Sequence, residues 1–207
     1  MKRFFALWLC CLPVLTHAAD REWRFRVWLD DREIGRHRFS LSEEDGLQRV
    51  LSEADFEYRL LFVKLYEYRH RDEEIWRESC LASIESSTDA NGKDYRVEGA
   101  LQPGGFVVSG SGGETRLPEC VMSFAYWNPE FLQQERLLNS QNGKWLDVTV
   151  SDPVPDELEV RGALREASRY RLEAGELCID LWYSPQGDWL ALETRTDGGR
   201  VLRYELL

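Results

Sequence analysis

The stretch "EWRFRVWLDDREIGRHRFSL" (Glu22–Leu41) alternates between apolar and charged residues with a period of two. Its first half places these apolar residues on one face: Trp23, Phe25, Val27 and Leu29. Charged residues occupy most of the opposite face. Such alternation is typical of a β-strand with one buried face. Asp30 and Asp31 favour a turn, so the stretch predicts a β-hairpin.

The same pattern recurs along the chain. In residues 177–207, turn-forming residues at 184–187 and 197–199 interrupt the alternation, which predicts three more strands. Further strands are expected around these turn signals: Asn91-Gly92, Ser109–Gly113 and Asn142-Gly143. No linker or repeat divides residues 20–207, so we expect a single β-rich domain. The predicted fold is mainly β, an antiparallel meander forming a curved sheet or open barrel.

Residues 47–68 fit two patterns. Their apolar positions keep helical spacing almost without a break. Phe56, Tyr58 and Leu60 alternate equally well, and aromatic residues favour strands. We predict strands here, with a single long helix as the alternative.

A short helix is predicted over about residues 129–137, packed on the sheet. Asn128 is a good N-cap, and Pro129 suits the first helical position. The apolar residues that can then face the sheet are Phe131, Leu132 and Leu138.

The N-terminal sequence "MKRFFALWLCCLPVLTHAA" is typical of a cleaved export signal. Lys2 and Arg3 precede an apolar run of 12 residues, which is shorter than the roughly 20 residues that a membrane-spanning helix needs. We therefore expect a signal peptide at residues 1–19, cleaved near Ala18 or Ala19. No stable membrane insertion is expected after its removal, because charges interrupt every later apolar run.

The chain is strongly acidic, with a formal net charge of −11 at pH 7. An acidic surface repels nucleic-acid phosphates and anionic lipid headgroups. We therefore expect no nucleic-acid partner and no electrostatic docking on membranes.

Three cysteines follow the expected signal peptide: Cys80, Cys120 and Cys178. In an oxidising compartment two of them are expected to pair, and the sequence permits three pairings. We favour a Cys80–Cys120 disulfide, because Cys178 lies in the strand-like run "LCIDLWY" and is expected to pack as a small hydrophobic residue.

The sequence contains no motif that specifies chemistry. Ser111 lies in "SGSGGE", which has the composition of a hairpin turn. His37 and His70 are isolated and give no metal-ligand spacing. We interpret acidic clusters such as Glu73-Glu74 as solvated turns. We expect no catalytic residues, no metal and no cofactor, although an enzyme of unrecognised type stays an open alternative.

Three stretches carry a family resemblance: "EIWRESCLASIESSTDANGK", "CVMSFAYWNPEFLQQERLLNSQNG" and "IDLWYSPQGDWLALETRTDGGRVLRYEL". The chain resembles a bacterial family of exported proteins classed as a domain of unknown function, most specifically in the motif Ser123–Pro129. The resemblance implies a periplasmic location and a β-rich fold, and no activity. The layout is also distantly similar to the open barrels of periplasmic lipoprotein carriers, but no motif of those carriers is matched.

The leading functional hypothesis is a non-enzymatic protein that binds a lipid or other apolar ligand in the concave face of its sheet. The expected ligand-binding residues are Phe124, Tyr126, Trp127, Phe131 and Gln134. Asn128 is expected to be occupied as a helix cap. The alternative is a structural or partner-binding envelope module with a filled barrel and no ligand.

Overall fold

The computed structural model describes residues 20–60, 63–196 and 198–207. The predicted signal peptide lies outside them and stays a prediction. Within the described ranges the elements are β1 (Arg21–Leu29), β2 (Arg32–Glu44), β3 (Leu47–Leu60), β4 (Val63–Arg77), β5 (Cys80–Ala90), β6 (Lys93–Gln102), β7 (Gly105–Gly110), β8 (Gly113–Leu117), the 3-10 helix η1 (Pro129–Gln133), β9 (Arg136–Leu138), β10 (Trp145–Asp147), β11 (Thr149–Val150), β12 (Val154–Val160), β13 (Ala163–Ala174), β14 (Leu177–Tyr183), β15 (Trp189–Arg195) and β16 (Val201–Leu206). In this part of the chain, no helix has the length and apolar character needed to cross a bilayer.

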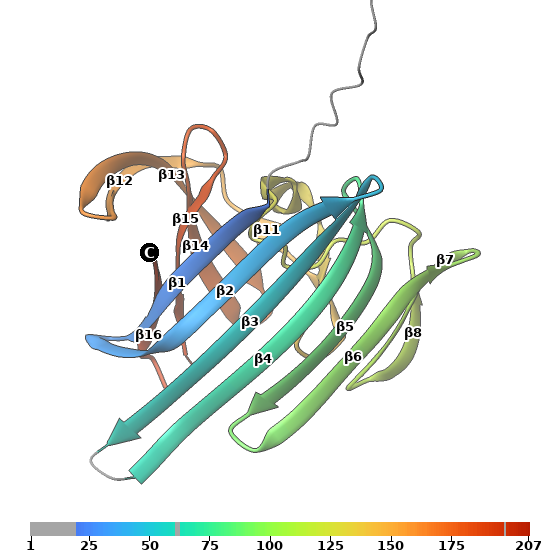
Figure 1. Ribbon diagram of the computed structural model, residues 1–207, viewed down its shortest axis with the longest axis horizontal. Coiled ribbons are helices and arrows are strands. Elements are labelled where there is room, and N and C mark those ends of the chain that lie inside the picture. Colours follow the sequence, from blue (N-terminus) through green and yellow to red (C-terminus); the bar gives the residue numbers. More distant parts are fainter. Residues whose placement is uncertain (1–19, 61–62, 197) are drawn as a thin grey trace, which may run out of the picture.

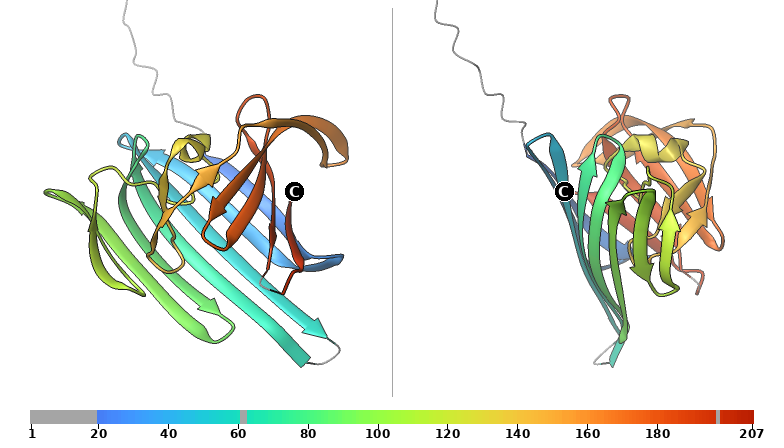
Figure 2. Two further views of the ribbon diagram at one scale, coloured as in Figure 1. Left: turned by 180° about the vertical axis from the view of Figure 1, so that it is seen from behind. Right: turned by 90° about the vertical axis from the view of Figure 1, so that its right-hand side faces the viewer.

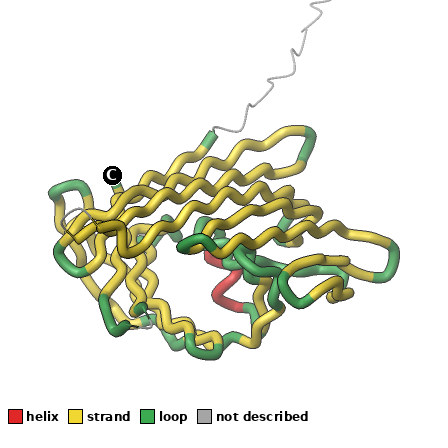
Figure 3. Tube along the Cα trace, turned by 90° about the horizontal axis from the view of Figure 1, so that it is seen from below, coloured by secondary structure: helices red, strands yellow, loops and turns green. Residues whose placement is uncertain are grey.

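One 14-stranded antiparallel sheet dominates the described residues (Figure 1). Strands β1 to β8 pair in sequence order, β13 to β16 do the same, and β16 pairs back with β1, where Phe25 lies opposite Leu206. The sheet path ends at β8 and β11, which do not pair with each other. The sheet therefore curves around an interior without closing (Figure 3), as the sequence predicts.

Residues 47–68 contribute to the long strands β3 and β4, so the strand interpretation is confirmed over the described part of this segment. Val50, Ala54 and Phe56 are buried and point to the same face of β3. In the register of the two strands, Ala54 lies opposite His70. The helical spacing of the sequence therefore has no structural counterpart, because cross-strand pairing on both sides decides the conformation.

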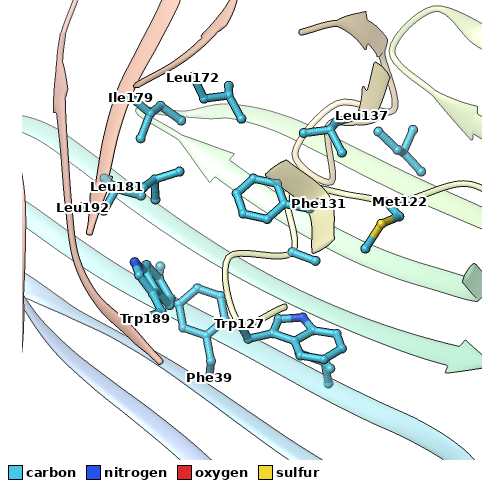
Figure 4. Packing of buried hydrophobic residues seen from close by; sticks show 14 of the residues in the cluster. Phe39, Met122, Trp127, Phe131, Leu137, Leu172, Ile179, Leu181, Trp189 and Leu192 are labelled. Atoms are coloured by element: carbon cyan, nitrogen blue, oxygen red, sulfur yellow. The ribbon is translucent and has the colours of Figure 1, made fainter. Parts of the chain in front are cut away.

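The apolar inner face of the sheet forms the core. Strands β2–β4 make one wall and β12–β16 the facing wall, with η1 at the top of the space between them (Figure 2). Fully buried residues include Phe25, Phe131 and Trp189. Phe131 points from η1 toward Leu181 (Figure 4). Burying one such side chain stabilises the fold by about 1.5–3 kcal/mol.

Residues 118–148, here called the plug segment, connect β8 to β11 and lie against this inner face. The segment contains η1 and the β9–β10 hairpin, in which Leu138 lies opposite Trp145. Asn128 caps η1 by accepting a hydrogen bond from the Glu130 backbone N–H at 3.1 Å, as predicted. The helix ends at Gln133 and not near residue 137, because Arg136–Leu138 pair with β10 and the adjoining Gln134 is extended.

A disulfide joins the start of β5 to the plug segment. Cys80 and Cys120 are bonded, with 4.9 Å between their Cα atoms, which confirms the predicted pairing. The Leu81 backbone N–H donates to the Val121 carbonyl beside it at 2.9 Å. Cys178 is unpaired as predicted, but the expectation that it packs inside is wrong. Its neighbour Ile179 faces the core, so strand alternation exposes Cys178 on the outer face.

We expect the Cys80→Ser/Cys120→Ser double variant to lose about 4 kcal/mol of unfolding free energy, since the bond closes a long loop in the unfolded chain. Urea titration followed by circular dichroism measures the loss. Cys178→Ser is the matched control and should change the unfolding free energy by about 0.5 kcal/mol or less. Equal stability of the double variant and the control would contradict this account of the bond.

Candidate functional site

A row of polar side chains lines the inner face of β4. Strand alternation turns Tyr68, His70, Asp72 and Glu74 toward the interior. Asp72 is 5% exposed and Glu74 is 4% exposed. The expectation that Glu74 belongs to a solvated turn is therefore wrong. Buried carboxyl groups are costly unless they are paired or protonated, so this row needs a physical explanation.

The two buried histidines form hydrogen bonds to hydroxyl groups and are held neutral by burial. His37 contacts the Tyr204 hydroxyl at 3.2 Å and the Ser52 hydroxyl at 2.7 Å. His70 contacts the Thr88 hydroxyl at 2.8 Å. Burial lowers the pKa of His37 well below its ordinary value, and proximity to His70 lowers it further. Burial alone lowers the pKa of His70 to about 4. Neither histidine therefore carries a charge near neutral pH.

Asp72 and Glu74 behave as a coupled pair. Burial raises the pKa of Asp72 well above its ordinary value, and the neighbouring Glu74 carboxyl raises it further. Burial also raises the pKa of Glu74, against hydrogen bonds from Ser123 and Trp76. The Trp76 Nε1–H donates to Glu74 Oε2 at 2.9 Å. A hydrogen bond between the two carboxyl groups raises the pKa of Asp72 and opposes the rise in the pKa of Glu74, so of the two Asp72 is favoured to be the protonated one.

The plug segment covers this polar row and leaves a cavity of about 240 Å³, here called the interior cavity. The cavity is lined by the β4 row and inner-face residues of β2 and β3, by residues 123–127 and 139–141 of the plug segment, and by residues of β14 to β16. Tyr68 donates its hydroxyl hydrogen to Gln141 Oε1 at 3.2 Å, and Ser86 donates to the Ser140 carbonyl. These bonds hold the plug segment over the inner face of β4 and β5.

Two buried polar atoms on the cavity wall have no hydrogen-bond partner among the described residues: Asp72 Oδ1 and Trp127 Nε1. One is a carboxyl oxygen from the sheet and the other is an indole donor from the plug segment. Native proteins satisfy nearly all buried polar atoms, so two such atoms in one cavity are unusual. A ligand that fills the cavity could satisfy both.

The structure brings together three of the five residues that the sequence suggested as ligand contacts. Phe124, Tyr126 and Trp127 line the interior cavity. Phe131 is fully buried behind them and packs edge-on against Tyr126, with 5.7 Å between ring centroids. Gln134 is exposed, and its side-chain amide donates to the Glu130 carbonyl at 3.5 Å. Gln134 therefore lies away from the cavity.

Sequence reasoning missed the sheet side of the site, above all Asp72 and Glu74. In "YRHRDEEIW", residues 68–76, both faces of the strand are polar, so hydrophobic alternation gives no sign of which face is buried. The available signal is the pair of large aromatic residues at the ends, Tyr68 and Trp76. They share a face because their positions in the strand differ by an even number.

Acid should destabilise the protein through His70. Its pKa is lower in the folded protein than the ordinary value of about 6.5 in the unfolded chain, so the unfolded chain binds more protons between these values. The low pKa of His70 therefore stabilises the folded protein by about 3 kcal/mol above pH 6.5. This stabilisation is lost as the pH falls from 6.5 toward 4. His70→Asn should remove this part of the pH dependence, measured as urea unfolding free energy at a series of pH values. The same slope in His70→Asn and wild type would contradict the assignment.

Asp72→Asn should be more stable than the wild type at high pH. The raised pKa of Asp72 means that its stabilising contribution is present below about pH 4 and is lost as pH rises. Asn can still donate to Glu74 and needs no proton from solution, so we expect a gain of about 1 kcal/mol at pH 8. Thermal unfolding at several pH values measures it, with Glu73→Gln on the outer face of β4 as control. A large loss of stability at pH 8 would show that the carboxyl group serves the fold.

Comparison with known proteins extends the description of the fold. A family model described as a domain of unknown function, DUF6134, matches residues 25–207. No curated protein matches the chain. A solved structure described as a β-barrel-like protein of the domain of unknown function DUF1849, from Brucella abortus, is similar in fold. That likeness has a TM-score of 0.60 at 12% sequence identity and covers 90% of this chain and 95% of the other. The chain, with its curved β-sheet, belongs to the DUF6134 family.

Proposed function

We propose that the protein binds a small amphipathic organic molecule in the interior cavity. The observation that carries the proposal is the joint presence of aromatic walls and two unpartnered polar atoms in one buried space of about 240 Å³. A buried cavity of about 150 Å³ is large enough for benzene, so a substituted aromatic or short aliphatic molecule fits here. The aromatic side chains would bury its apolar part, and the polar atoms would orient it.

The volume of the cavity limits the size of a lipid or other ligand that it can enclose. Pockets for drug-sized molecules measure about 300–1,000 Å³. The interior cavity is smaller, so the proposed ligand is a small molecule or one end of a lipid, with the remainder outside. The polar β4 row also argues against a purely apolar ligand, because such a ligand would leave Asp72 Oδ1 unpartnered.

The place of action is proposed to be an oxidising compartment outside the cytoplasm. The Cys80–Cys120 disulfide supports this location, because such bonds persist mainly in exported proteins. The predicted signal peptide supports it independently. For a bacterial protein, the periplasm is the compartment that fits both features.

A second candidate is a structural envelope module that binds no small molecule. It is favoured by the internal pairing of many interior groups, such as His37 with Tyr204 and Ser52. The packed apolar end of the interior, shown around Phe131 in Figure 4, supports it as well. The two functions differ in whether the space next to Trp127 accepts a molecule.

Binding can be tested with the neutral probe 3-phenylpropan-1-ol. We expect saturable binding at about millimolar affinity, as the size of the probe allows. The indole N–H signal of Trp127 should shift in the NMR spectrum of the labelled mature protein when the probe is added. The signal is assigned by its absence from the spectrum of Trp127→Phe.

Ala125 is buried on the cavity wall, so Ala125→Phe should fill the space and weaken probe binding at least tenfold. Ala163→Phe, at an exposed position of β13, is the matched control and should bind as the wild type does. Circular dichroism checks that both variants are folded. Absence of saturable binding to the wild type, or equal binding to Ala125→Phe, would favour the structural module.

A further inference from the structure

Among its described residues, the wall of the interior cavity has two carboxyl groups and no side chain that is cationic near neutral pH. Asp72 and Glu74 line it, and none of its described lining residues is Arg or Lys. The basic side chains of the lining are His37 and His70, whose pKa values burial holds low. An anionic ligand would therefore meet two carboxyl groups with no cation to offset them, at a cost that increases with burial.

The arginines nearest to this row along the chain are directed elsewhere. Arg69 and Arg71 alternate with the polar row and lie on the outer face of β4. Arg69 forms an ion pair with Glu67 at 2.5 Å, and Arg71 pairs with Glu53. These pairs neutralise charge on the outside of the sheet and leave the interior carboxyl pair without a cationic partner.

The remaining wall suits an organic cation. Asp72 Oδ1 offers an unpartnered acceptor, and the side chain is 5% exposed. The aromatic residues Phe124, Tyr126 and Trp127 line the same cavity. A carboxylate attracts an ammonium group through a charge-assisted hydrogen bond, and aromatic faces attract the same cation electrostatically. The combination of a buried carboxyl group and aromatic walls favours an amine over a neutral or anionic molecule of equal size.

We infer that the ligand of the interior cavity carries a protonated amine, which hydrogen-bonds to Asp72 while the apolar body of the ligand packs against Phe124, Tyr126 and Trp127. This inference rests on the proposed function, because it names the chemical class of the molecule that the same cavity binds. Glu74 supports the site by accepting hydrogen bonds from Ser123 and Trp76, which favour its ionised form against the effect of burial.

Binding of the cation would also change the protonation of the buried carboxyl pair. Without a ligand, burial and the neighbouring Glu74 favour the protonated form of Asp72. An ammonium group beside Asp72 favours the ionised carboxylate, so ligand binding would release a proton from Asp72 to solvent. The ligand replaces that proton as the positive partner of the pair.

The test compares three probes of nearly equal shape at pH 7.5: 3-phenylpropan-1-amine, 3-phenylpropan-1-ol and 3-phenylpropanoate. Dissociation constants come from the NMR shift of the Trp127 indole signal. In the wild type we expect the amine to bind at least tenfold more tightly than the alcohol, and the carboxylate to bind more weakly than the alcohol. In Asp72→Asn the amine and the alcohol should bind within threefold of each other.

Glu73→Gln is the matched control, because this carboxyl group lies on the same strand and faces outward to Arg49. It should keep the full preference for the amine. If Asp72→Asn fails to fold, the comparison of the amine with the alcohol in the wild type decides the inference. Equal affinity of the wild type for the two probes overturns it. Retention of the preference in folded Asp72→Asn also overturns it. Binding of the alcohol without preference for the amine leaves the proposed function standing, whereas failure of all three probes to bind contradicts that function itself.

Discussion

The attachment of the plug segment to the inner face of β4 and β5 is the constraint on which the interior depends. The sheet alone would leave a polar row open to solvent inside a curved surface. The Cys80–Cys120 bond fixes one end of the plug segment beside β5, and hydrogen bonds to Gln141 and Ser140 hold its far end. The interior is therefore divided into an apolar part filled around Phe131 and a polar part that retains a cavity.

This division also separates two kinds of burial in physical terms. Around Phe131 and Trp189, apolar side chains fill the space and their burial drives folding. Around Asp72, burial opposes folding, because an ionisable group is removed from water without complete pairing. Proteins retain such locally unfavourable groups mainly where they serve a purpose other than stability. The polar row has this character on one wall of a core that is otherwise apolar.

Much of the architecture could be predicted because strand alternation is a strong local signal. The buried face of β1, for example, is identified by three alternate apolar residues, Trp23, Phe25 and Val27. The site was predictable only in part. Phe124 and Trp127 stood out by composition, whereas Asp72 lies in a strand with polar residues on both faces. Which face of β4 is buried depends on pairing with β3 and β5, and pairing is a property of the whole sheet.

The pairing of β1 with β16 has a consequence for the order in which the molecule forms. Phe25 lies opposite Leu206, and the Leu207 backbone N–H donates to the Arg24 carbonyl at 2.8 Å. One edge of the first strand thus stays unpaired until the last residues of the chain are available. Contacts so distant in sequence form slowly, because a long loop must close before they contribute. In a chain of this topology, the sheet edge at β1 is therefore completed only after the last strand has been synthesised.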